Sequence, residues 1–204
     1  MSHDHPRTAG DWDDRYRSAD RIWTSDANPA LIRETADLAP GTALDVGSGE
    51  GADARWLADQ GWTVVAVDIS EVAVQRAADI DARDAISWVQ ADLTVDDVPG
   101  GPFDLIAVHY FPIAADDDAV VAKLVAALAP GGTLLDVMHA PEGVIAHGFD
   151  LSAFLQPADV AERFADQLDV EKLETVPRGR PAGGTQGAQH ADDVVLKARR
   201  TSAP

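Results

Sequence analysis

The chain has no cysteine among its 204 residues, which excludes disulfide bonds, thiolate nucleophiles and thiolate metal sites. It also has no run approaching the roughly 18 uninterrupted apolar residues that a membrane-spanning helix needs. Its first residues, MSHDHPRTAGDWDD, are polar and acidic, unlike the basic and then apolar plan of a signal peptide. We therefore expect a cytoplasmic protein that binds no membrane and no metal.

Positive charge is scarce, because 16 Lys and Arg residues face 35 Asp and Glu residues and the formal net charge is -19. Such a surface repels nucleic acid phosphates and anionic lipid head groups. The expected partner is a small-molecule substrate rather than a nucleic acid, and we expect the protein to be a monomer or a homodimer. The length and the apolar content of 46% suit one globular domain spanning residues 1–204.

Short runs rich in Val, Ile and Leu alternate with amphipathic stretches after a first helix expected near 11–19. Strand and helix in regular succession indicate parallel pairing, with helices on both faces of the sheet. The apolar runs predict strands at 42–46, 63–68, 86–90, 103–109 and 132–139, and the amphipathic stretches predict helices at 52–60, 72–78 and 117–128.

The last part of the chain has a different pattern. A helix is predicted at 157–167, and two strand-like runs at 169–176 and 192–200 follow it, joined by a loop rich in Gly and Pro. Two strands joined in this way form an antiparallel hairpin. The predicted fold class is therefore α/β: a Rossmann-like, doubly wound, seven-stranded sheet that is mostly parallel and has an antiparallel C-terminal edge hairpin.

The clearest local signal is the segment ALDVGSGEGADARWL, in which Gly47, Gly49 and Gly51 alternate between a strand and a helix. Glycines at this place let the chain turn sharply and let a ligand approach the backbone closely. The next predicted strand ends in Asp68, where a doubly wound nucleotide site places a carboxylate for the ribose hydroxyls. These residues predict a nucleotide-like ligand at the carboxyl ends of the strands.

The pattern resembles the class I S-adenosylmethionine (SAM)-dependent methyltransferase family along nearly the whole chain. The family's first motif, an acidic residue followed by alternating glycines, corresponds to Asp45-Val46-Gly47-Ser48-Gly49-Glu50-Gly51. The resemblance implies that SAM is the cofactor, that residues 41–140 bind it and that Asp45 orients its methionine end. Beside Asp68, Ile69 can pack on the adenine ring and Asp92 can accept from the adenine amino group. The predicted cofactor-binding residues are Trp23, Asp45, Gly47, Ser48, Gly49, Gly51, Asp68, Ile69, Ala91, Asp92, Leu93 and His109.

Two alternatives to a methyltransferase remain open. Gly47, Gly49 and Ala52 also fit the GxGxxG/A fingerprint of dinucleotide sites, which allows an NAD-dependent oxidoreductase. Asp45 favours SAM, because its carboxylate would repel a diphosphate but attract the ammonium and sulfonium of SAM. The sequence shows no obvious catalytic base, so a non-catalytic SAM-binding module is the second alternative.

The acceptor is expected where the fourth and fifth strands end, at His109, Tyr110 and His139. Methyl transfer needs an aligned nucleophile, and it needs a general base only when the nucleophile arrives protonated. His109 is either a catalytic residue beside the transferred methyl group or a hydrogen-bonded structural residue. His139 is interpreted as structural.

The stretch WDDRYRSADRIWTSDANPAL is similar to the opening of the tellurite-resistance and thiopurine methyltransferase-like branch of the family. This resemblance implies that residues 1–30 form a lid, with Trp23 over the pocket, and that basic residues in the C-terminal part, 157–200, help to bind the acceptor. An ordinary packed helix and a solvated hairpin loop are the alternatives. The predicted acceptor is a thiol, a metalloid oxyanion or an anionic metabolite, and the predicted catalytic residues are His109, Tyr110, Arg178 and His190.

Overall fold

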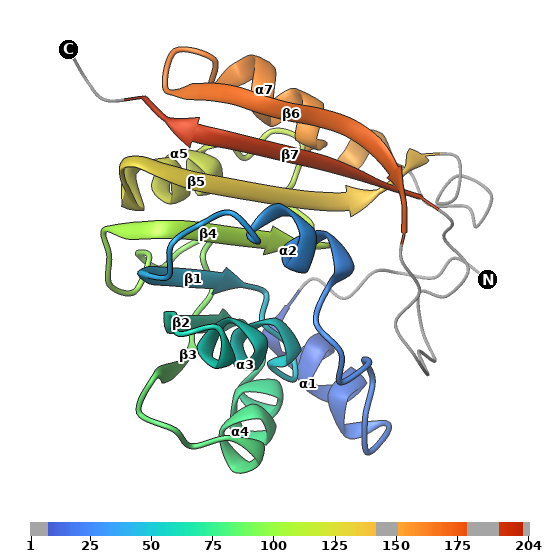
Figure 1. Cartoon of the computed structure of the whole chain (residues 1–204). Helices are drawn as coiled ribbons and strands as arrows, with labels where there is room; N and C mark the ends of the chain where they lie inside the picture. Colours follow the sequence, from blue (N-terminus) through green and yellow to red (C-terminus); the bar gives the residue numbers. More distant parts are fainter. Residues whose placement is uncertain (1–7, 142–150, 179–191, 202–204) are drawn as a thin grey trace.

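The computed structural model describes residues 8–141, 151–178 and 192–201. Its strands form one seven-stranded sheet in the order β3-β2-β1-β4-β5-β7-β6 (Figure 1). Strands β1 to β5 pair in parallel, whereas β7 pairs antiparallel with both β5 and β6. The fold class predicted from the sequence is therefore confirmed. The strands are β1 Thr42–Val46, β2 Thr63–Asp68, β3 Ile86–Gln90, β4 Phe103–His109, β5 Leu128–His139, β6 Leu168–Pro177 and β7 Asp192–Arg200.

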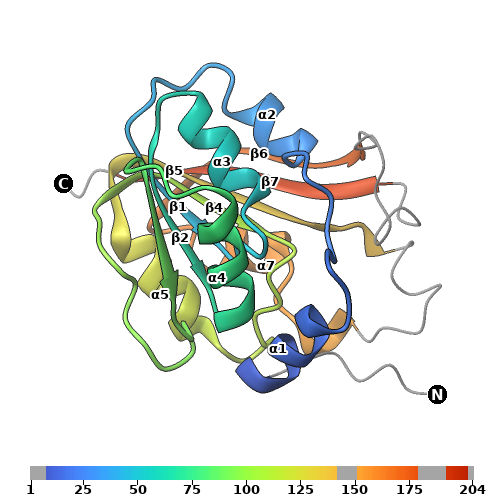
Figure 2. The same cartoon turned by 90° about the horizontal axis from the view of Figure 1, so that it is seen from below.

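Helices cover both faces of the sheet (Figure 2). On one face, Leu31 of α2 and Leu57 of α3 belong to the same buried cluster as Leu105 of β4. On the other face, Leu124 of α5 belongs to a second buried cluster with Ile106. Neighbouring residues of a strand point to opposite faces, so β4 contributes to both clusters. The helices are α1 Ala9–Arg17, α2 Pro29–Glu34, α3 Ala52–Asp59, α4 Glu71–Ile80, α5 Asp118–Ala127, α7 Pro157–Arg163 and a short 3-10 helix at Leu151–Ala153.

The start of β5 differs from the prediction. The strand begins at Leu128 rather than at residue 132, so Pro130-Gly131-Gly132 lies inside it. Opposite this segment the pairing with β4 shifts register between Phe103 and Leu105, and Gly131 has a φ of 76°. The tripeptide is thus a bulge in the strand, which a local pattern of turn residues does not distinguish from a turn.

The end of α7 also differs from the prediction, because the helix stops at Arg163 and not at residue 167. The chain turns through Phe164, whose carbonyl accepts from the backbone N–H of both Gln167 and Leu168. Leu168 is buried and begins β6, so the helix must end early enough for the chain to enter the sheet. Across the described residues, no helix has the length and apolar character to cross a membrane.

The parallel strands bring their carboxyl ends to one edge of the sheet, where open α/β folds bind ligands. Val46 of β1 aligns with Val67 of β2 on one side and with Val108 of β4 on the other. The residues that follow these three strands are therefore neighbours in space. Figure 1 shows α1 beyond this edge.

Candidate cofactor and acceptor site

The turn after β1 is built on backbone angles that favour glycine. Gly47, Gly49 and Gly51 have φ values of 68°, 52° and 78°. A Cβ atom on Gly49 would lie 3.0 Å from the hydroxyl of Tyr16, and one on Gly51 would lie 2.3 Å from the ring of Trp88. The three alternating glycines are thus required by both conformation and close contact, and the turn leads directly into α3.

Asp68, the last residue of β2, joins this turn to the start of α4. Its Oδ2 accepts a hydrogen bond of 2.8 Å from the N–H of Gly49, and its Oδ1 accepts one of 2.8 Å from the N–H of Ser70. Burial raises the pKa of Asp68, and these two hydrogen bonds partly offset that effect. Each carboxylate oxygen can accept two hydrogen bonds, so each still has capacity for a ribose hydroxyl.

The predicted adenine-side residues lie in the two loops that follow β2 and β3. The N–H of Ala91 donates to the carbonyl of Asp68 at 3.0 Å, so the loops are hydrogen-bonded to each other. Leu93 is buried and Ile69 is half-buried. Asp92 shapes its own loop, because its Oδ1 accepts from the N–H and the hydroxyl of Thr94 at 2.9 and 2.7 Å.

The segment between α1 and α2 lies against the glycine turn. Trp23 donates from its indole Nε1 to the hydroxyl of Tyr16 at 2.9 Å. Glu50, within the glycine motif, accepts from the N–H groups of Ile22 and Trp23 through Oε2 at 3.1 and 3.0 Å, and its Oε1 lies 3.3 Å from Nη1 of Arg76. The turn therefore holds the chain segment that covers it.

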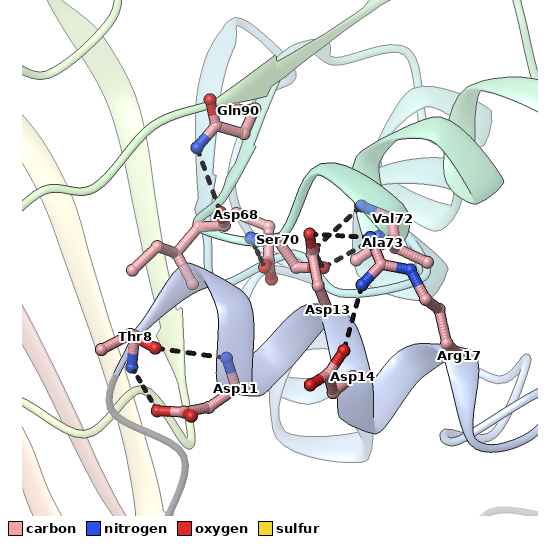
Figure 3. Close-up of polar contacts among 11 residues, drawn as sticks. Thr8, Asp11, Asp13, Asp14, Arg17, Asp68, Ser70, Val72, Ala73 and Gln90 are labelled. Carbon is pink, nitrogen blue, oxygen red and sulfur yellow. Dashed lines mark hydrogen bonds and ion pairs between the residues drawn. The ribbon is translucent and has the colours of Figure 1, made fainter.

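Helix α1 is attached to the same edge by Asp13 (Figure 3). Its Oδ1 accepts from the hydroxyl of Ser70 at 2.6 Å and from the N–H of Val72 at 3.2 Å, at the start of α4. A carboxylate at a helix N-terminus satisfies free amide groups and interacts favourably with the helix dipole. Despite an opposing effect of desolvation, these bonds and the nearby Arg17 lower the pKa of Asp13.

Asp45 and His109 are both buried on the α3 face of the sheet. Nδ1 of His109 lies 2.6 Å from Oδ2 of Asp53, a residue in the first turn of α3. Burial, reinforced by the charge of Asp53 and opposed by His109, raises the pKa of Asp45 to about 8. The sequence suggested that His109 lies beside the transferred methyl group. In the structure, its ring is buried and paired with the carboxylate of Asp53.

A second cluster lies where β4, β5 and β7 meet. Tyr110 donates its hydroxyl to Oδ2 of Asp193 at 2.8 Å, and its ring stacks on His139 with centroids 4.2 Å apart. Nδ1 of His139 lies 3.3 Å from Oδ1 of Asp193, and the guanidinium of Arg178 lies 4.8 Å from the Tyr110 ring centroid. Two predicted catalytic residues, Tyr110 and Arg178, are thus together, whereas His190 lies outside the described residues.

Tyr110 has a φ of 53°, a backbone conformation that is costly for an aromatic residue. Its N–H donates to the carbonyl of Val137 at 2.8 Å, which together with the hydroxyl contact to Asp193 fixes this conformation. Burial, the charge of Asp193 and the hydrogen bond to it raise the pKa of Tyr110. Its hydroxyl is therefore a hydrogen-bond donor rather than a base at neutral pH.

Sequence reasoning did not single out Glu50, Asp53 or Asp193. Glu50 was part of the motif but was not given a role, although an acidic side chain between glycines at a turn is a ready acceptor for backbone N–H groups. Asp53 occupies the first turn of α3, a position typical of acidic capping residues. Asp193 required the pairing of β7 with His139 on β5, which no local pattern supplies.

Residues 43–132 match a family described as a methyltransferase domain. This part of the chain is therefore similar to a methyltransferase domain. An uncharacterised methyltransferase of Mycobacterium tuberculosis is 32% identical over 120 residues, which make up 56% of this chain and 59% of that protein. A relative from Mycobacterium bovis gives the same values, so the chain spans less than two thirds of the length of these relatives.

Solved structures share the fold of this chain. The N-methyltransferase NodS from Bradyrhizobium japonicum, in complex with S-adenosylhomocysteine, has a TM-score of 0.73 and 20% identity, with 96% of this chain and 100% of that one covered. TehB from Haemophilus influenzae has a TM-score of 0.64 and 14% identity, with 84% of this chain and 61% of that one covered. At these identities the likeness shows the fold alone.

Proposed function

We propose that the protein transfers a methyl group from SAM to a small-molecule acceptor. The observation that supports this most directly is the placement of Asp45 and Asp68, two buried carboxyl groups, on either side of one glycine turn. A carboxyl group ahead of the turn suits a ligand with an ammonium and a sulfonium better than one with a diphosphate. When bound, SAM supplies an electrophilic methyl group on its sulfur.

The chain's own residues bind and enclose this cofactor. Asp68 accepts hydrogen bonds from the ribose hydroxyls through its remaining lone pairs, and the glycine turn allows close approach to the backbone. Ile69, Asp92 and Leu93 lie beside the adenine. In the lid predicted at residues 1–30, of which residues 1–7 lie outside the described residues, Trp23 excludes water from the cofactor.

The cluster of Tyr110, His139, Arg178 and Asp193 is the proposed acceptor site. It lies at the ends of β4 and β5, next to the turn that binds the cofactor. Arg178 offers a planar guanidinium, which suits a carboxylate or another oxyanion. We propose an anionic metabolite or a metalloid oxyanion as the acceptor, with a thiol as the other candidate, and a place in the tellurite-resistance and thiopurine methyltransferase-like branch.

Binding and turnover measurements test the proposal in two stages. Calorimetry with SAM, S-adenosylhomocysteine and NAD should show binding of the first two and none of NAD, and the reverse would favour an oxidoreductase. Transfer of a labelled methyl group from SAM should then be measured with thiols, oxyanions and carboxylates. Binding of SAM without transfer to any of these acceptors would favour a non-catalytic SAM-binding module.

A further inference from the structure

A groove outside the candidate site lies between α3 and the segment that joins Trp23 to α2. Its volume is about 460 Å³, which is within the range of small-molecule sites. One wall is formed by residues 25–27 and Ile32 of α2, and the other includes Arg55 and Trp56 of α3. None of the cofactor or acceptor residues described above lines the groove, so it is a separate place in the fold.

The groove contains a guanidinium whose charge has no carboxylate partner. Arg55 is half-buried and donates from Nη1 to the carbonyl of Glu50 at 2.7 Å, but it forms no ion pair with any residue in the described part of the chain. By contrast, Arg83, which also lines the groove, pairs with both Asp59 and Asp81. A half-buried charge without a counter-ion is unfavourable, so an anion is favoured beside Arg55.

The rest of the groove combines an apolar surface with one more carboxylate. The ring of Trp56 is half-buried, and Ile32 is 42% exposed, so both offer apolar surface to a ligand. Asp26 also lines the groove, but it is exposed, so water and salt screen its charge more than that of Arg55. The groove therefore favours a ligand with one negative charge on an apolar body.

The segment that forms one wall is attached to the start of α3 on both sides of the groove. Glu50 accepts from the N–H of Trp23 at 3.0 Å, and Oδ1 of Asp53 accepts from the N–H of Asn28 at 2.6 Å. Residues 25–27 lie between these two attachments. A ligand that contacts both residues 25–27 and α3 would add to the bonds that hold this segment beside the glycine turn.

We propose that this groove binds a small monocarboxylate with an aromatic or aliphatic body, and that the bound ligand strengthens cofactor binding by holding the segment in place. The carboxylate accepts from the donors of Arg55 that Glu50 does not use, and the apolar body lies against Trp56 and Ile32. A phosphate ester fits the single uncompensated charge less well, because it carries about 1.5 to 2 negative charges at pH 7. The groove itself is independent of the proposed function, whereas its effect on the cofactor rests on it.

An NMR titration of the full-length protein with benzoate, benzamide and phenyl phosphate tests the site. Benzoate should bind with a Kd on the order of 1 mM and shift the signals of residues 25–27 and of Nε of Arg55. Benzamide, which has the same shape without the charge, should bind about tenfold more weakly. Equal binding of the two, tighter binding of phenyl phosphate, or shifts confined to Tyr110 in the acceptor site would each overturn the proposal.

Three substitutions test the charges. Arg55→Gln removes the charge but keeps an amide that can donate to the carbonyl of Glu50, and benzoate should then bind as weakly as benzamide. Asp26→Asn removes the opposing carboxylate and should strengthen benzoate binding by about twofold. Arg33→Gln changes an arginine that lies outside the groove and pairs with Glu34, and binding should stay the same. Wild-type affinity in Arg55→Gln, or weaker binding in Asp26→Asn, would contradict the assignment.

Calorimetry with S-adenosylhomocysteine tests the effect on the cofactor. Saturating benzoate should lower the Kd of S-adenosylhomocysteine by about fivefold or more, and S-adenosylhomocysteine should lower the Kd of benzoate by the same factor, because coupling between two sites is reciprocal. Benzamide at the same concentration is the control. An unchanged Kd would overturn the coupling, and a protein that bound benzoate but no S-adenosylhomocysteine would overturn the proposed function and leave the groove assignment intact.

Discussion

Lowering the pH should weaken binding of SAM and S-adenosylhomocysteine through Asp45. Burial and the charge of Asp53 raise the pKa of Asp45 to about 8, although His109 opposes this. At pH 7 the carboxyl group is therefore about 90% protonated in the free protein. The ammonium of the cofactor favours the ionised form, so binding lowers this pKa and releases the proton.

The magnitude follows from the linkage between the two equilibria. While Asp45 is protonated in the free protein and ionised in the complex, one proton leaves for each cofactor bound, and Kd rises about tenfold for each pH unit below 8. Between pH 7 and pH 5.5 the expected loss of affinity is about 30-fold. The measurement stops at pH 7, because α-amino groups lose their own proton at about pH 7.7–8.0.

Calorimetry in two buffers with different ionisation enthalpies measures the proton release directly. At pH 7 the wild-type protein should release about 0.9 proton per S-adenosylhomocysteine bound. Asp45→Asn should bind more weakly and release almost none, with a similar Kd at both pH values, whereas Asp92→Asn should keep the wild-type release. A wild-type Kd that is flat between pH 5.5 and pH 7, with no proton released, would refute this reasoning.

Three further changes separate the other parts of the site. Asp68→Asn should weaken S-adenosylhomocysteine and 5′-methylthioadenosine by the same factor, about tenfold, because both carry the ribose; a selective loss in calorimetry would contradict this. Glu50→Ala should speed amide hydrogen exchange at Ile22 and Trp23 by about tenfold or more, because their acceptor is removed; unchanged exchange would show that Glu50 does not hold this segment. Burial raises the pKa of Asp136 to about 7, so the native state binds a proton that the unfolded state releases near pH 4, and stability should fall as the pH rises towards 7. In thermal melts at pH 5 and pH 7.5, Asp136→Asn should show a smaller drop in Tm than the wild-type protein, and equal drops would argue against this titration.

Most of the sheet could be predicted from the sequence, because its strands are continuous apolar runs between clear turns. The bounds of β1, β2, β3, β4 and β7 agree with the predicted ranges. The start of β5 could not be predicted, since Pro130-Gly131-Gly132 reads locally as a turn and only the pairing with Phe103 makes it a bulge. The end of α7 depended in the same way on where the chain enters β6.

In the candidate site too, features set by neighbouring residues could be predicted, and features set by distant residues could not. The glycine turn and Asp68 depend on local backbone geometry and were predicted to lie at one site, and the N–H of Gly49 donates to Oδ2 of Asp68. The side-chain direction of His109 depends on Asp53, which is 56 residues away in the chain, so its pairing could not be predicted. The cluster around Asp193 joins Tyr110, which is 83 residues away, to a strand on the other side of β5.

The position of Glu50 has a consequence for the rate of turnover. One carboxylate in the glycine motif holds the backbone of Ile22 and Trp23 and also contacts Arg76. Under the proposed function, S-adenosylhomocysteine would leave and SAM would enter past this segment, because Trp23 lies against Gly49, and these bonds would then have to break. We therefore expect release of S-adenosylhomocysteine to limit turnover, and different acceptors to show similar maximal rates.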